Sequence, residues 1–422
     1  MIARLGAALL ALLLAPVFGC ALLTSTLDEV PPTVLPGDEY EALFPYYVEL
    51  CAVTQYRSLE FGDGGVPGHA VMYLKGACRD EAADFPSLRA CRREATTRDD
   101  PEHGAGISVN RWFRNANWIA VPGTDLFFDG GLEDDAVLDQ DAFDRAVAAS
   151  IEAGIFDHID FDPAYPTRSE ERSLEDFVAQ QSIATDFALR FSRSAFCSRM
   201  PVTEEMMEDI ADYLNLVNAE YAAGNADYSW SGYSDNCVHL LRNSLAAASI
   251  WQPRSVQTTK LQQLANLAVP ANEVINLADL GAHGPLEDGR DVYRTDEARD
   301  ALLDFDWLPR RHGALVTILP VHEPNELFDT RGRILVLESP FSFGATRKFN
   351  RILFDPRFTE LRPNLEYFRG VYADILAEGN EIIAGGFLPL RSLRYLRVTK
   401  RYFQYVEAQL AEVDAMLKRI AE

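Results

Sequence analysis

Short apolar segments with strand-like composition mark the first third of the chain. Three of them, rich in β-branched or aromatic side chains, lie at residues 69–74, 106–110 and 117–121. In the first segment His69, Val71 and Tyr73 share one face, because alternate side chains of a strand point to the same side. These segments predict a sheet in which His69 opens a strand.

Apolar residues take a helical spacing from about residue 140 onward. Phe143, Val147 and Ile151 recur every four residues, and residues 140–225 are expected to be mostly helical. Another helix is predicted over residues 237–250.

Beyond about residue 285 the hydrophobic pattern changes to a pair of strands followed by two helices. Residues 314–319 and 333–337 predict a pair of strands joined by a turn-forming linker. Two amphipathic helices are expected near residues 359–378 and 391–421. With the earlier segments, this pattern predicts an α+β protein.

Charge narrows the range of partners. The chain has 39 Lys and Arg against 64 Asp and Glu, which gives a formal charge of −25. Such a surface repels phosphate backbones, so no nucleic acid is expected as a partner, and it also repels anionic headgroups. Seven acidic residues without a basic one lie in residues 129–144, where we expect a solvated loop entering a helix, with a calcium loop as the alternative.

The first 20 residues have the pattern of an export signal. A single basic residue precedes a short Ala- and Leu-rich run over residues 5–16, too short for a membrane span. The segment VFGC at residues 17–20 resembles a bacterial lipobox, which implies a signal peptide over residues 1–19, acylation of Cys20 and attachment to a membrane. Ala21 after the cysteine indicates the outer membrane. The alternative is an ordinary cleaved signal peptide. Residues 20–40 are then expected to form a proline-rich tether.

The number of cysteines leaves one unpaired in the mature chain. With Cys20 assigned to lipid, five remain in an oxidising compartment, where pairing is expected. Cys78 and Cys91 flank a short charged stretch and make a plausible bridge, and Cys51 with Cys197 is the pairing left by elimination. Cys237 then stays free.

Cys237 lies where a helix is predicted to begin. Asn236 or Asp235 can cap that helix, because a short side-chain oxygen accepts from the N–H groups of the first turn. The positive end of a helix favours thiolate over thiol, and its N–H groups would face a developing oxyanion. The alternative is a packed or disulfide-bonded cysteine.

A nucleophilic cysteine needs a base within hydrogen-bond reach. His69 can face the cysteine helix across a sheet, whereas His239 lies about 200° around the helix from Cys237 and is expected to point away. His158, Asp160 and Asp162 form an alternating polar set that is expected to be exposed rather than to bind a metal.

Two motifs together resemble a known family. GHAVMYL at residues 68–74, followed far downstream by NCVHLLRN at residues 236–243, is similar to the circularly permuted branch of the NlpC-type papain-fold cysteine hydrolases. Within that branch the resemblance is to the Lnb N-terminal periplasmic type domain, with lecithin retinol acyltransferases as more distant relatives. It implies a permuted papain-like domain over residues 41–285, with antiparallel strands packed on the Cys-bearing helix, a large helical insertion, and an extension over residues 286–422.

The resemblance also implies roles for individual residues. Cys237 corresponds to the nucleophile and His69 to the general base. The group that orients the imidazole should lie on the following strand, with Asn110 as first choice and Ser108 as second. Tyr73 and Tyr233 are expected to line the cleft.

These roles favour acyl transfer without a cofactor or metal. The first hypothesis is a lipid-anchored amidase or peptidase acting on cell-wall peptides. The second is a lipid acyltransferase or thioesterase. The third is a non-catalytic envelope-assembly scaffold in which Cys237 is packed or bridged.

Overall fold

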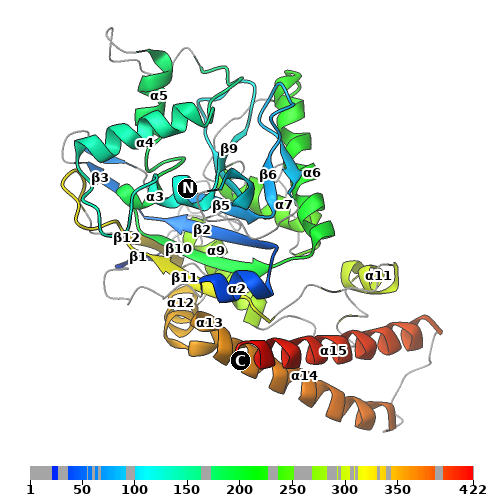
Figure 1. Ribbon diagram of the computed structural model, residues 1–422. Coiled ribbons are helices and arrows are strands. Elements are labelled where there is room, and N and C mark those ends of the chain that lie inside the picture. The colour runs from blue at the N-terminus through cyan, green and yellow to red at the C-terminus, as the bar shows by residue number, and fades with distance from the viewer. Residues whose placement is uncertain are drawn as a thin grey trace, which may run out of the picture.

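The computed structural model describes most of the chain in ordered elements (Figure 1). The described residues are 21–26, 37–54, 56–58, 62–64, 68–91, 100–162, 173–226, 236–250, 269–282, 292, 296–304, 308, 312–329, 333–338, 344–384 and 393–421. The strands are β1 (Ala21–Thr26), β2 (Tyr47–Val53), β3 (Tyr56–Ser58), β4 (Gly62–Gly64), β5 (His69–Lys75), β6 (Ala77–Arg79), β7 (Leu88–Ala90), β8 (Gly104–Val109), β9 (Trp118–Pro122), β10 (Ala195–Pro201), β11 (Leu315–Leu319) and β12 (Arg333–Glu338). The helices are α2 (Gly37–Leu43), α3 (Thr124–Asp129), α4 (Gln140–Glu152), α5 (Leu174–Ser182), α6 (Glu204–Ala222), α7 (Cys237–Ala247), α9 (Pro270–Ala282), α11 (Asp296–Asp304), α12 (Ala345–Phe354), α13 (Pro356–Thr359), α14 (Leu361–Ala384) and α15 (Leu393–Arg419), with short 3₁₀ turns η2 (Pro101–His103) and η3 (Leu189–Phe191).

A six-stranded antiparallel sheet is the centre of the fold. Its strand order is β11-β10-β2-β5-β8-β9. The pairing of β5 with both neighbours starts at its first residues, with Val53 opposite His69 on one side and Ser108 opposite Val71 on the other. The mixed helix and strand content confirms the α+β class expected from the sequence.

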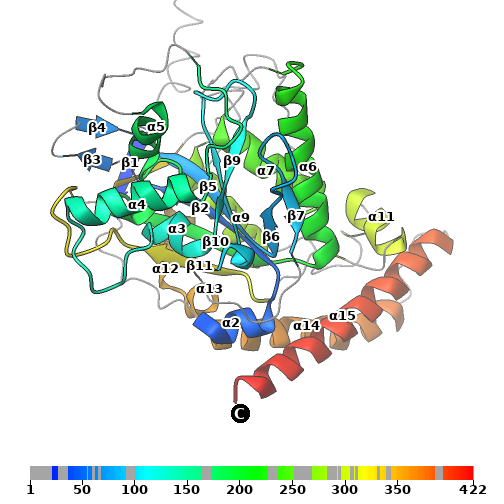
Figure 2. The ribbon, with the colours of Figure 1, turned by 45° about the horizontal axis from the view of Figure 1, so that its top comes forward.

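Helices cover both faces of this sheet (Figures 1 and 2). On one face α6, α7, α9 and α12 enclose a core that includes Ala70, Met72 and Leu241. On the other face α2, α3, α4 and the α14–α15 hairpin enclose a second core that includes Val71, Tyr73 and Phe127. Because alternate residues of each strand enter opposite cores, the strands are buried on both faces, which explains their nearly continuous apolar composition.

Three local expectations need correction. The segments at residues 314–319 and 333–337 do form strands, but they do not pair with each other: β11 pairs with β10, and β12 pairs with β1. β1 lies in the stretch expected to be a tether. β10 interrupts the stretch expected to be helical, because its apolar residues pair with β2 and β11 in the sheet. Since β11 completes this sheet, residues from both expected regions, 41–285 and 286–422, share it.

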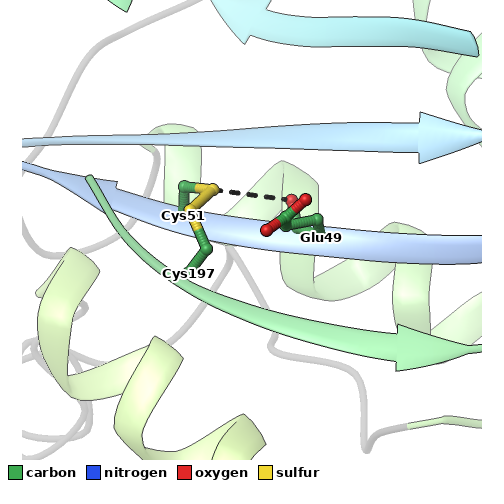
Figure 3. Close-up of side chains that lie close together, drawn as sticks. All are labelled: Glu49, Cys51 and Cys197. Carbon is green, nitrogen blue, oxygen red and sulfur yellow. Dashed lines mark hydrogen bonds between the residues drawn. A yellow bond between two sulfur atoms is a disulfide. The ribbon is translucent and has the colours of Figure 1, made fainter. Parts of the chain in front are cut away.

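Both expected disulfides are present. Cys51 and Cys197 join the neighbouring strands β2 and β10 at opposite positions, and Cys78 and Cys91 join β6 to the end of β7. Figure 3 shows the first bridge with the Glu49 carboxylate beside it. Glu49 is buried and accepts hydrogen bonds from Arg199 at 2.9 Å and Thr317 at 2.7 Å, so its charge is compensated across β2, β10 and β11.

A second buried ion pair lies at the far end of β5. Lys75 is fully buried and contacts both the Glu41 carboxylate and the His103 imidazole. His103 in turn lies 2.7 Å from the Tyr73 hydroxyl. The hydrogen bonds and the Lys75 charge hold the pKa of Glu41 well below its usual range despite the opposing effect of burial.

Candidate functional site

The candidate site lies at the end of the sheet where β5 begins. Helix α7 packs against β5 and starts with Cys237. Asn236 caps the helix, because its side-chain oxygen accepts the Val238 N–H at 3.0 Å and also lies 3.0 Å from His239 Nδ1. The amide oxygen is only an acceptor, so His239 donates to it and serves the helix cap.

The thiol of Cys237 lies at the backbone of β5. The backbone N–H groups of Ala70, Val238 and Cys237 itself act to lower the pKa of the thiol and so favour its ionised form. Ala70 is the residue after His69, and its side chain shares the apolar core with Cys237. Successive residues of a strand point to opposite faces, so the side chain of His69 lies on the face of the sheet opposite to Ala70 and Cys237. Thiol and imidazole can therefore meet only around the end of the sheet where β5 starts.

A hydrogen-bonded chain leads away from His69. His69 Nε2 lies 3.1 Å from Ser108 Oγ, and the Ser108 hydroxyl donates to Asp186 Oδ1 at 2.7 Å. Asn110 Nδ2 donates to the other carboxylate oxygen of Asp186 at 2.9 Å. The imidazole is therefore oriented by Ser108, the second choice from the sequence, while Asn110 supports Asp186. The reason is the register, which puts Ser108 opposite Val71 and diagonal to His69.

Asp186 was not predicted from the sequence. It is fully buried in a tight loop between α5 and η3, and its N–H bonds to the Ser182 carbonyl at 2.8 Å. Ala184 and Ala188 on either side of it have φ of 61° and 48°, which is strained for residues other than glycine. Such strain concentrates at functional sites, since the surrounding structure must compensate for it. No sequence motif marks this loop.

Arg193 is the other residue that sequence analysis missed. It is buried, and the next residue, Ser194, extends the β10–β2 pairing by accepting the Thr54 N–H at 3.0 Å. The guanidinium charge acts on three groups of the site: it lowers the pKa of Cys237, of Asp186 and of His69. A buried cation thus belongs to the same cluster.

Burial sets the resting protonation of the site. It raises the pKa of the Cys237 thiol to about 11, against the N–H groups and the Arg193 charge, and it lowers the pKa of His69 to about 3, with Arg193 adding to the effect. Burial also raises the pKa of Asp186, against three side-chain hydrogen bonds and Arg193. The expectation of a lowered thiol pKa is therefore wrong: desolvation outweighs the helix end.

The remaining expected residues divide into two groups. Tyr73 does not line a cleft, because it is fully buried against Phe127 and Phe128, about 13 Å along the strand from His69. Three others lie outside the described residues: Cys20, Tyr233 and Asp235.

Two clusters in the described part of the chain have the composition of a metal site. They are Glu49 with Cys51 and Cys197, and Glu102 with Cys78 and Cys91. In both clusters the two sulfurs are bonded to each other, so neither offers a thiolate ligand.

The acidic stretch at residues 129–144 has structural roles where its partners are described. Asp139 caps α4, and Asp129 pairs with Arg190.

No family model, curated protein or solved structure matches this chain. None of the described helices has both the length and the hydropathy of a membrane span.

Proposed function

We propose that the protein is a cysteine hydrolase that transfers acyl groups, an amidase or peptidase of the permuted NlpC-type papain-like class acting on cell-wall peptides. The observations that carry the proposal are the chain from His69 through Ser108 to Asp186 and a free, helix-capped cysteine whose thiol interacts with the backbone of Ala70, the residue after His69. Nucleophile, base and orienting group are the parts that acyl transfer needs.

The direction of the hydrogen bonds assigns the base. Three side-chain hydrogen bonds and the Arg193 charge favour an ionised Asp186 against the burial that raises its pKa. In that ionised form the Ser108 hydroxyl gives its proton to the carboxylate, so Ser108 Oγ accepts from His69. His69 then carries its proton on Nε2 and has a lone pair on Nδ1. That nitrogen would take the thiol proton while the sulfur attacks a substrate carbonyl, and the N–H group of Cys237 at the helix start would stabilise the oxyanion, since the Val238 N–H is already held by the Asn236 cap. The imidazolium would return the proton to the leaving amine, and water would release the acyl group.

The directions of the two pKa shifts favour proton transfer that is concerted with attack. Burial raises the pKa of the Cys237 thiol and lowers that of His69, so the neutral thiol and imidazole are favoured at rest over a preformed thiolate–imidazolium pair. General-base catalysis of thiol attack fits this resting state. The same raised pKa favours the second candidate function, a non-catalytic envelope scaffold with Cys237 as a packed thiol.

Turnover by matched variants separates the two. The mature protein is incubated with purified muropeptides, and new amines and carboxylates are measured by mass spectrometry, for the wild type, Cys237→Ala and His69→Gln. The enzyme proposal expects cleavage by the wild type alone, with an acyl adduct on the Cys237 peptide in rapidly quenched samples. Equal product from the wild type and Cys237→Ala, or none from either, would refute the enzyme proposal and favour the scaffold.

For the location of the protein we propose a lipid anchor on Cys20 at the periplasmic side of a bacterial membrane, with the outer membrane favoured by Ala21. The lipobox-like VFGC at residues 17–20 supports it, together with two disulfides, which are typical of an oxidising compartment. Intact-mass measurement of the membrane-extracted protein tests it. The expected species begins at Cys20 and carries acyl chains, and an unmodified N-terminus would contradict the proposal.

A further inference from the structure

The chain directly after Cys20 is fixed to the folded body. Strand β1 starts at Ala21 and pairs antiparallel with β12, Ala21 lying opposite Glu338. With an acylated Cys20, the anchor would have no free linker, and the surface around Glu338 would be held at the bilayer.

The end of β12 nearest the anchor, at Leu337 and Glu338, is itself held by hydrogen bonds. The buried side chain of Asn272 makes two hydrogen bonds of 2.8 Å with the backbone of Leu337. The carboxylate of Glu338 accepts the N–H groups of Gly344 and Thr346 at 3.0 and 2.7 Å, where α12 begins. Figure 1 shows α12 beside the β1–β12 pair, and α12 packs on β12.

Helix α12 is strongly amphipathic. Its apolar stripe is buried in the core, where Phe349 packs edge-to-face on Phe196. Its outer stripe carries Arg347, Arg351 and Phe354, spaced at i, i+4 and i+7, and Phe354 is 67 % exposed.

The outer face of α12 is basic in a strongly acidic protein. Residues 344–354 contain three cations and no carboxylate, whereas the whole chain has a charge of −25. Among the residues that the structure describes, Lys348 and Arg351 share one counterion, Asp279 on α9. With Arg347, the cluster retains an excess of positive charge. The Glu338 carboxylate is directed at the N–H groups of the helix start.

We infer that the outer face of α12, formed by Arg347, Lys348, Arg351 and Phe354, is a membrane-contacting surface that binds anionic phospholipid headgroups beside the acyl anchor. The inference rests on the proposed acylation of Cys20 but not on the proposed enzymatic activity. Charge complementarity selects the anionic lipid, and an exposed aromatic ring next to basic residues is typical of helices that lie in the interface. The repulsion expected from the total charge is thus replaced locally by attraction.

Hydroxyl-radical footprinting of the full lipidated protein tests this surface. The protein is reconstituted in vesicles of phosphatidylcholine alone or mixed with phosphatidylglycerol, and oxidation of Phe354 is compared with that of Leu216, which is 60 % exposed on α6. On the mixed vesicles the oxidation rate of Phe354 should fall at least about threefold relative to phosphatidylcholine, and high salt should reverse the effect, because headgroup attraction is screened. Leu216 should keep its rate.

Charge variants provide the matched comparison. Arg347→Gln/Lys348→Gln/Arg351→Gln should lose the protection of Phe354, whereas Arg369→Gln/Arg397→Gln/Lys400→Gln on the α14–α15 hairpin, which removes the same charge, should keep it. Equal protection in both variants, protection of Leu216 instead, or protection that depends on protein concentration rather than lipid, which marks a second copy, would each overturn the inference. Intact mass shows separately whether Cys20 carries the anchor, so its failure and that of the α12 surface are distinguishable.

Discussion

Replacing His69 by Gln should flatten the dependence of stability on pH between about 7.5 and 4.5. His69 is half-buried at the start of β5, and its pKa is lowered from 6.5 to about 3, mainly by desolvation. Because the folded state keeps the imidazole neutral, its contribution to stability is fully present above pH 6.5. It is lost as the pH falls from 6.5 toward 3, where the unfolded chain binds a proton that the folded one excludes.

The magnitude follows from the two pKa values. At pH 4.5 the unfolded histidine is almost fully protonated and the folded one almost fully neutral, which sets an upper value of about 2.7 kcal/mol of unfolding free energy, because the half-buried imidazole keeps part of its solvation. Glutamine retains an N–H donor for Ser108 but does not titrate. The wild type should therefore lose up to about 2.7 kcal/mol more than His69→Gln on acidification, since other titrating groups cancel in the comparison.

Urea unfolding followed by circular dichroism at pH 7.5 and 4.5 measures this difference. His158→Gln, at an exposed histidine, is the matched control. The unfolding free energy that it loses between pH 7.5 and 4.5 should differ from the loss of the wild type by less than about 0.5 kcal/mol. If His69→Gln and the wild type lose the same stability, the imidazole titrates normally. The argument that burial holds it neutral would then be refuted.

Three further predictions concern neighbouring groups. Alkylation of Cys237 by iodoacetamide at pH 7.5 should be at least about tenfold slower than that of an ordinary thiol of pKa 9.0. With a pKa of about 11 a smaller fraction of the thiol is ionised, and the higher nucleophilicity of its thiolate offsets only part of that loss. Peptide mass spectrometry measures the rate, and a rate plateau near neutral pH would contradict the prediction. Glu41→Gln should destabilise the fold by about 3–5 kcal/mol in urea unfolding, because it leaves the buried Lys75 charge without its carboxylate. The double variant Glu41→Gln/Lys75→Met removes that charge and should recover most of the lost stability. If it does not, the unpaired charge is not the cause of the loss. Arg193→Met should raise the pKa of His69 above about 3 but leave it below 6.5, because burial, the larger cause of the lowered pKa, remains. NMR titration measures this, with His69→Gln to assign the signal, and an unchanged titration would remove Arg193 from the site.

Local rules determined the parts of the site that lie within single elements. The start of β5 at His69 followed from strand composition, and the start of α7 at Cys237 followed from a short polar cap before an apolar helical run. The odd number of cysteines, with two plausible pairings, left Cys237 as the free thiol, and the structure confirms both bridges. Each of these conclusions depends on residues close in sequence or on counting.

Only the tertiary structure decided which groups surround His69 and how they are charged. Asp186 reaches Ser108 across 78 residues of sequence, and Arg193 joins them because β10 pairs with β2, a register that no local pattern specifies. The thiol pKa likewise depends on burial. A helix end favours thiolate by at most about 2 kcal/mol, whereas desolvation depends on everything packed around the sulfur and reverses the sign. Sequence fixes the identity and local geometry of reactive groups, but their electrostatics are a property of the folded surroundings.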